Sequence, residues 1–233
     1  MIFKREESFF YVCALCGISK KDNKEILLGT GSFIEKDNKF YILTASHVIS
    51  SNTPVTHIKL SDVNKKCVSL SLTQLNKNQK WLSHPIADMC VFEIDSSNND
   101  WIKTRSFPYN QCSLNMNGFN RDIELTTVGF PCGLGASSHF SPLTFRSFPS
   151  IEVISLMRFD LPIVSDFFLL EDPSIGGYSG GPVFDLGYKV DGLITQTKEE
   201  TILYGIMHGF IGNGTTGGEM AAVTPISYLK DLI

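Results

Sequence analysis

Short runs of apolar residues, or of alternating apolar and polar residues, recur along the whole chain, with turn-forming residues between them. Examples of these runs are FFYVCALCGI, EILLGTGSFIE, KFYILTA, IELTTVGF and TILYGIMHGF. Each run has the length and the composition of an ordinary β-strand. The polar segment EKDNKF at 35–40 lies between two of them and is typical of a hairpin turn. The pattern therefore predicts an all-β protein, built as barrels or sandwiches.

Two stretches depart from this pattern. DSSNNDWIKTRSFPYNQCSLNMNG is polar and rich in Asn and Ser, and it separates the strand-like runs into two groups. PISYLKDLI, at the C-terminal end, has helical spacing, and Pro225 suits the first turn of a helix. We therefore expect two β subdomains that are joined by a connector and followed by a short C-terminal helix.

The composition is that of an ordinary soluble globular protein, with 42% hydrophobic and 19% charged residues among 233. A net charge of −4 and the absence of a basic run longer than KK argue against a nucleic-acid-binding face. The start, MIFKREESFF, has no apolar segment of the secretory type, and no stretch approaches the ~18 apolar residues of a membrane span. We therefore expect a cytoplasmic protein that binds neither nucleic acid nor membrane.

Six cysteines are present, and without a secretory signal we expect free thiols that are mostly buried. Cys13 and Cys16 form a lone C-x-x-C motif, whose role the sequence leaves open. A structural zinc site would need a second ligand pair at matching spacing, and none occurs. The sequence therefore predicts no metal site and no cofactor.

The glycine-rich segment SIGGYSGGPVFD surrounds Ser179, which a neighbouring base could activate as a nucleophile. Its G-x-S-x-G pattern is also that of the α/β-hydrolase elbow, for which Asp185 or Asp191 and then His208 would follow in the required order. That elbow needs a helix to begin at the serine. Pro182 and β-forming residues follow Ser179 instead, so the sequence argues against this alternative.

The opposite order, with a histidine and an aspartate upstream of the serine, fits better. LTASHVI places His47 directly after a strand-like run. In ADMCVFEI, Asp88 opens an apolar run, where a partly desolvated carboxylate needs a partner such as an imidazole N–H. The other histidines lack a motif, and we interpret His57, His84 and His139 as surface or packing residues.

Together, LTASHVI, ADMCVFEI and GGYSGGPVF resemble the three signature segments of the trypsin/chymotrypsin-like serine proteases, in the same order. GTGSFI, TTVGFP and YGIMHGF extend the resemblance over nearly the whole chain. The resemblance implies a single unit over 1–233 with two antiparallel, six-stranded-type β-barrels and a short C-terminal helix. The N-terminal barrel would lie within 1–100, the connector at 101–120, and the C-terminal barrel with the terminal helix within 121–233.

The resemblance also implies a role for each motif residue. His47 would be general base and then acid, Asp88 its orienting carboxylate and Ser179 the acylating nucleophile. The backbone N–H groups of Gly177 and Ser179 would form the oxyanion hole. The implied activity is that of a serine endopeptidase acting on protein or peptide substrates. The alternative is a catalytically inactive module of the same fold that binds peptides or a partner protein, and the need for a regulatory partner stays open.

Two positions differ from the pattern of the secreted family members. Tyr178 stands where many of them carry an aspartate that pairs with a processed N-terminus. Val48 follows His47, so the disulfide that braces the family's histidine is missing. Both differences fit an intracellular enzyme that is not activated as a zymogen.

The expected specificity pocket is less well defined. The residue at its base would be Pro173, so the resemblance does not support an acidic base and a preference for Arg or Lys. Glu171 and Asp172 are close enough to keep that question open.

Two segments compete for the strand that binds the substrate backbone, 191–197 and 204–210. The second leaves a C-terminal tail of better length, and we favour it. His208, Gly209 and Phe210 would then line the active-site cleft. His208 would replace a small polar residue beside the triad, where it would either support or perturb Asp88.

Overall fold

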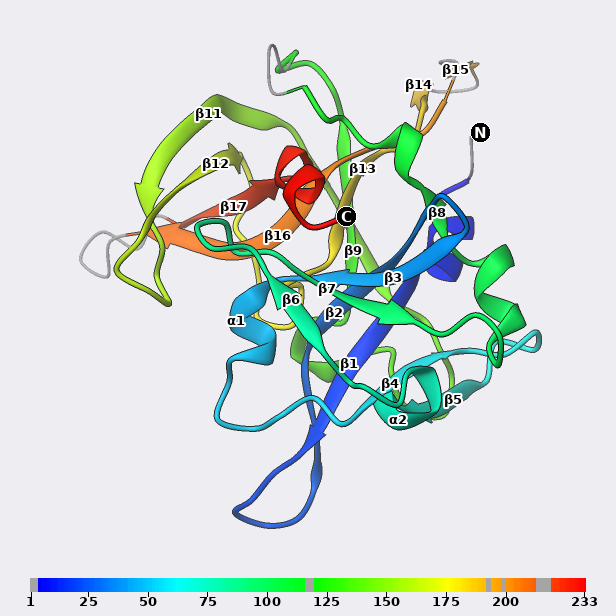
Figure 1. Cartoon of the computed structure of the whole chain (residues 1–233). Coiled ribbons are helices and arrows are strands. Elements are labelled where there is room, and N and C mark those ends of the chain that lie inside the picture. The colour runs from blue at the N-terminus through cyan, green and yellow to red at the C-terminus, as the bar shows by residue number, and fades with distance from the viewer. Residues whose placement is uncertain (1–3, 116–119, 192–193, 198–199, 213–218) are drawn as a thin grey trace.

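The computed structural model describes residues 4–115, 120–191, 194–197, 200–212 and 219–233 (Figure 1). Strands form most of the regular structure, and no helix in these ranges is longer than six residues. None of the described helices is long and apolar enough to cross a membrane. The all-β class expected from the sequence is confirmed.

The first sheet contains eight strands, in the order β5-β4-β1-β2-β3-β7-β6, with β8 paired to β2. All pairs are antiparallel except β2 with β8. The strands are β1 (Val12–Ile18), β2 (Glu25–Lys36), β3 (Lys39–Thr44), β4 (His57–Ser61), β5 (Cys67–Ser71), β6 (Trp81–Ser83), β7 (Cys90–Ile94) and β8 (Phe107–Pro108).

The second sheet contains seven antiparallel strands in the order β10-β9-β13-β16-β17-β12-β11, and β14 and β15 form a separate hairpin. The strands are β9 (Leu125–Gly129), β10 (Leu143–Ser147), β11 (Pro149–Met157), β12 (Val164–Leu170), β13 (Pro182–Asp185), β14 (Tyr188–Asp191), β15 (Ile194–Thr197), β16 (Ile202–Gly212) and β17 (Glu219–Pro225).

The described helices are short, with three to six residues each. They are η1 (Glu7–Tyr11), α1 (Ser46–Ile49), α2 (Leu72–Leu75), η2 (Asp100–Thr104), η3 (Tyr109–Gln111), η4 (Pro131–Gly133) and η5 (Ile226–Asp231). The last is a 3₁₀ helix after β17, at the place where the sequence predicts a short C-terminal helix. Figure 1 shows the two sheets as the two halves of the molecule.

The predicted turn at 35–40 joins β2 to β3. Lys36 pairs with Lys39, and the two residues between them, Asp37 and Asn38, have φ angles of 53° and 60°. Positive φ at both central positions is the geometry of a type I′ hairpin turn, which Asp and Asn tolerate better than most residues. Local turn chemistry therefore sets this register.

The two sheets share the largest hydrophobic cluster of the described residues. It includes Phe33 and Ile42 from the first sheet together with Phe184 and Ile206 from the second. Phe107 belongs to the segment expected as the connector, 101–120, of which residues 116–119 lie outside the described residues. Its ring packs 5.2 Å from that of Phe184, so this part of the segment joins the core.

The turn that carries Ser179 is held by the first sheet. Thr30 of β2 makes two hydrogen bonds to this turn. Its backbone N–H donates to the Ser179 carbonyl at 2.8 Å, and its hydroxyl donates to the Gly177 carbonyl at 2.8 Å. Gly180, with φ +78°, lies so close that a Cβ would be 2.0 Å from Thr44 Oγ1 and 2.3 Å from the Thr30 carbonyl. Contact between the sheets at this turn thus requires glycine.

We expect Gly180→Ala to lower the free energy of unfolding by about 2–4 kcal/mol, because the added methyl group is both strained and overpacked. Gly176→Ala is the matched control, since no atom lies within 4 Å of the Cβ position there. Urea unfolding of the two variants measures the difference. Equal stability would contradict the close packing of the turn against β2 and β3.

Candidate active site

His47 and Asp88 meet where β3 and β7 pair. Thr44 at the end of β3 lies opposite Cys90 at the start of β7, so α1 and the residues before β7 are neighbours. Asp88 Oδ2 lies 2.6 Å from His47 Nδ1, and Asp88 Oδ1 accepts the His47 backbone N–H at 2.9 Å. The side chain of Asp88 is fully buried, whereas that of His47 is 16% exposed. One carboxylate thus holds both the ring and the backbone of His47.

Three further donors surround Asp88. Ser46 Oγ donates to Oδ1 at 2.7 Å, and Arg158 Nη2 donates to the same oxygen at 3.0 Å. His208 Nδ1 lies 2.5 Å from Oδ2. From the sequence, His208 is expected beside Asp88, and its hydrogen bond stabilises the ionised carboxylate. Arg158 lies 70 positions from Asp88 and belongs to no sequence motif.

Arg158 reaches Asp88 from the segment between β11 and β12. Its Nε and Nη2 bond the two carboxylate oxygens of Asp160 at 2.9 and 2.5 Å, and its Nη1 donates to the Ile86 carbonyl at 2.9 Å. Burial would lower the pKa of Arg158, but Asp160 and Asp88 raise it above its usual value. The buried guanidinium therefore stays charged and is bound on every side.

Asp88 itself is ionised. Burial alone would raise its pKa, but the hydrogen bonds from His208 and His47 outweigh burial and hold the pKa well below its usual range. A carboxylate only accepts hydrogen bonds, so Nδ1 of each imidazole carries a proton. In neutral His47 the lone pair is then on Nε2, the nitrogen that a general base needs.

His208, on β16, is 1% exposed and lies between two phenylalanines. Its ring centroid is 4.4 Å from that of Phe159 and 4.7 Å from that of Phe167. Phe159 also packs edge-on against His47, at 5.0 Å. These aromatic contacts fix the planes of both imidazoles around Asp88.

The Ser179 hydroxyl bonds weakly to the backbone carbonyl of His208, at 3.5 Å. Within the described residues no hydrogen bond joins Ser179 to His47. Catalytic hydrogen bonds are often long or misaligned without substrate, and a rotation about χ1 redirects a serine hydroxyl. The structure thus connects His47 and His208 through Asp88, and Ser179 contacts the backbone of His208.

The backbone beside Ser179 exposes two N–H groups. The Gly176 carbonyl accepts the Cys132 N–H at 2.9 Å, and in a trans peptide the following N–H, that of Gly177, points the opposite way. Gly177 has φ +107°, and a Cβ there would lie 2.3 Å from the Phe130 carbonyl. In the described part of the chain, neither this N–H nor that of Ser179 donates to a protein acceptor. These are the two N–H groups to which the resemblance assigns the oxyanion hole.

A cavity of about 190 Å³ opens next to Ser179. It is lined by Phe159, Ser174, Ile175, Gly176, Ser179, Gly209 and Phe210, which include no charged side chain. Gly209 and Phe210 thus lie where the sequence analysis expects cleft residues. Pro173, Glu171 and Asp172 are exposed and are not among the lining residues.

The segment 204–210 is the one that lies beside Ser179. The N–H of Gly180 donates to the Met207 carbonyl at 2.7 Å, and the N–H of Met207 donates to the Gly181 carbonyl at 2.8 Å. The competing segment 191–197 contributes to the β14–β15 hairpin, and its residues 192–193 lie outside the described residues.

In the described residues, two groups of side chains are close enough to share a metal ion. One is His47, Asp88 and His208, whose ligand atoms are already engaged in the hydrogen bonds above. The other is Cys16, Glu25 and His57, on the first sheet.

No protein-family model matches the sequence, and no curated protein matches it either. Solved structures do match. The Rv3671c protease from M. tuberculosis in its active form aligns with a TM-score of 0.59 and 14% identity, over 96% of this chain and 79% of that one. The MamO protease domain from Magnetospirillum magneticum aligns with a TM-score of 0.61 and 12% identity, over 98% of both chains. The chain therefore has a trypsin-like protease fold, as its three motifs imply.

The lowered pKa of Asp88 predicts a loss of stability in acid. An aspartate has a pKa of about 3.9 in the unfolded chain. The charged Asp88 therefore stabilises the fold fully above that pH, and its contribution falls as the pH drops from about 4 toward the folded pKa. We expect Asp88→Asn to cost about 3–5 kcal/mol at pH 6, because Arg158 loses a buried partner. Thermal unfolding should show this difference shrinking toward pH 3, and a constant difference would contradict it.

Proposed function

We propose that this protein is a serine endopeptidase, with His47 as general base, Asp88 as its orienting carboxylate and Ser179 as nucleophile. The observation that carries the proposal is the buried Asp88 carboxylate at 2.6 Å from His47 Nδ1, which leaves Nε2 as the basic nitrogen. The trypsin-like fold supports the same assignment, since in that family the three motifs supply these three residues.

The proposed reaction begins when the Ser179 hydroxyl turns from the His208 carbonyl to His47 Nε2. Oγ then attacks the carbonyl carbon of the scissile peptide bond, and its proton passes to His47. The N–H groups of Gly177 and Ser179 bind the oxyanion, and losing one such donor typically costs about 3 kcal/mol in the transition state. His47 returns the proton to the leaving amine, and water, activated by the same nitrogen, hydrolyses the acyl-enzyme.

Arg158 and His208 are positioning residues in this mechanism. Both act through Asp88, which must remain ionised and fixed while His47 gains and loses a proton. Arg158 holds Oδ1 at 3.0 Å and His208 holds Oδ2 at 2.5 Å, so each carboxylate oxygen keeps a donor besides His47. This double support replaces the small polar residue that the family places beside the aspartate.

A second candidate function is an inactive module of the same fold that binds peptides. The contact that favours it is the Ser179 hydroxyl, which bonds to the His208 carbonyl at 3.5 Å and not to His47. The two candidates differ in whether Ser179 reacts.

We expect a fluorophosphonate probe to label wild-type protein at pH 8 and to leave Ser179→Ala unlabelled. His47→Ala should slow labelling by at least about a thousandfold, because the serine loses its base. Ser174→Ala is the matched control: Ser174 lines the same cavity, and its variant should be labelled normally. Mass spectrometry of the adduct measures all four proteins. Wild-type protein that is folded but unlabelled would contradict the proposed protease activity and favour the inactive peptide-binding module.

The uncharged cavity beside Ser179 predicts a preference for an apolar residue before the scissile bond. A volume of about 190 Å³ is smaller than the roughly 300 Å³ and more of typical small-molecule pockets and suits a single side chain. A peptide library should therefore show cleavage after residues such as Leu or Met in preference to Lys or Arg.

Two variants test which residues line this subsite. Ile175→Asp adds a carboxylate to the cavity and should raise the ratio of kcat/KM for Lys over Leu by roughly tenfold or more. Pro173→Asp adds the same charge at an exposed residue outside the cavity lining and should change the ratio less. A larger change in this ratio for Pro173→Asp than for Ile175→Asp would place Pro173 at the base of the pocket.

A further inference from the structure

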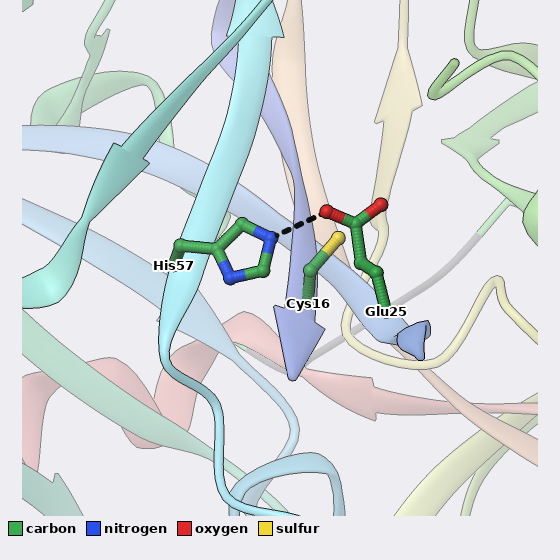
Figure 2. Close-up of side chains that lie close together, drawn as sticks. All are labelled: Cys16, Glu25 and His57. Atoms are coloured by element: carbon green, nitrogen blue, oxygen red, sulfur yellow. Dashed lines mark hydrogen bonds and ion pairs between the residues drawn. The ribbon is translucent and has the colours of Figure 1, made fainter. Parts of the chain in front are cut away.

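Three potential metal ligands converge on the first sheet, outside the hydrogen-bond network of Asp88 (Figure 2). Cys16 of β1 pairs directly with His57 of β4. Glu25 of β2 pairs with Ile18, two residues after Cys16, so its side chain lies on the same face as that of Cys16. The register of three neighbouring strands therefore brings a thiol, a carboxylate and an imidazole together, with their ligand atoms within 4.8 Å of one another.

In this cluster, one potential ligand atom of each residue faces the other two: Cys16 Sγ, Glu25 Oε2 and His57 Nε2. His57 Nε2 lies 2.8 Å from Glu25 Oε2, while the other carboxylate oxygen, Oε1, is bound by Lys59. His57 Nδ1 is engaged separately, at 2.9 Å from Thr56 Oγ1. Figure 2 shows Cys16 Sγ pointing into the gap between the imidazole and the carboxylate.

We propose that Cys16 Sγ, Glu25 Oε2 and His57 Nε2 bind a divalent transition-metal ion of the zinc class. Thiolate and imidazole are ligands that select zinc and its neighbours over magnesium and calcium, and a carboxylate oxygen completes a common donor set. Cys16 is 2% exposed, but the side chain of Glu25 is 42% exposed, so the ion enters, and a fourth ligand binds, from the side of Glu25.

The charges and hydrogen bonds of the cluster suit such an ion. The Cys16 thiolate and the Glu25 carboxylate together neutralise a 2+ charge, and Lys59 can remain on Oε1. The hydroxyl of Thr56 can either donate to His57 Nδ1 or accept from it. The same contact therefore holds the ring when Nε2 gives up its proton and binds the metal, as second-shell partners of metal-bound histidines do.

Binding must release the thiol proton. Burial raises the pKa of Cys16 to about 12, with the charge of Glu25 and the neighbouring Cys67 acting in the same direction and Lys59 opposing them. The thiol is thus protonated at neutral pH without metal. A metal ion that binds Sγ therefore displaces this proton.

Bound metal would fasten the ends of three strands. Cys16 and Glu25 flank the β1–β2 connection, and His57 opens β4. Lys59 extends the cluster to the other half of the chain, because its Nζ also donates to the Ala136 carbonyl at 3.2 Å. A metal here would stabilise the first sheet and its contact with the segment after η4, without touching the residues around Asp88.

The test is a titration of the purified full-length protein with Co²⁺, whose thiolate complexes absorb in the near ultraviolet. We expect one equivalent to bind with a thiolate-to-metal band, Zn²⁺ to displace it, and the melting temperature to rise on binding. Cys16→Ser should abolish the band. Cys67→Ser is the matched control, since Cys67 is a partly buried thiol on the adjacent strand β5 and should leave it intact.

Two further variants sharpen the result. Thr56→Val should weaken Co²⁺ binding by about ten- to a hundredfold, as the loss of a second-shell contact does. Ser179→Ala should bind as tightly as wild type, which separates this site from the proposed protease activity. A folded wild-type protein without the band, or a band that persists in Cys16→Ser, would overturn the proposal.

Discussion

The arrangement of the candidate site depends on one buried carboxylate, that of Asp88. An ionised carboxylate without water is costly unless every oxygen is hydrogen-bonded. Asp88 obtains its donors from α1, where Ser46 and His47 lie, and from the second half of the chain. There, β16 supplies His208 and the loop between β11 and β12 supplies Arg158. Satisfying this single charge therefore orients the imidazole of His47 and at the same time ties both halves of the chain together.

The turn that carries Ser179 likewise depends on contacts with the other half of the chain. It belongs to the second sheet, yet Thr30 of the first sheet holds the carbonyls of Gly177 and Ser179. Gly180 lets the two halves approach more closely than any side chain would allow. Residues of the second half thus contact Asp88, which holds His47, whereas a residue of the first sheet holds the turn that carries Ser179. Their relative geometry is a property of the packed interface, and neither sheet alone defines it.

The motif residues could be predicted because each carries a local signal. His47 follows a strand, Asp88 opens an apolar run and Ser179 lies among glycines, and the resemblance of these segments to one family gave their order a meaning. Arg158 carries no such signal and occurs in a loop of ordinary composition. The cluster of Cys16 also escaped sequence reasoning, since metal motifs are recognised by short spacings, whereas Glu25 and His57 follow Cys16 by 9 and 41 positions.

By itself, the sequence predicted the strands and the hairpin turn at 35–40, because alternation and turn chemistry act over a few residues. The residues proposed for catalysis came from the resemblance of three motifs to one family. The tertiary structure alone decided that Arg158 and His208 share Asp88, and that the Ser179 hydroxyl faces the His208 carbonyl. Those contacts join positions that are 29 to 120 residues apart. They arise from strand register and from the need to hydrogen-bond a buried charge, and both depend on how distant parts of the chain pack together.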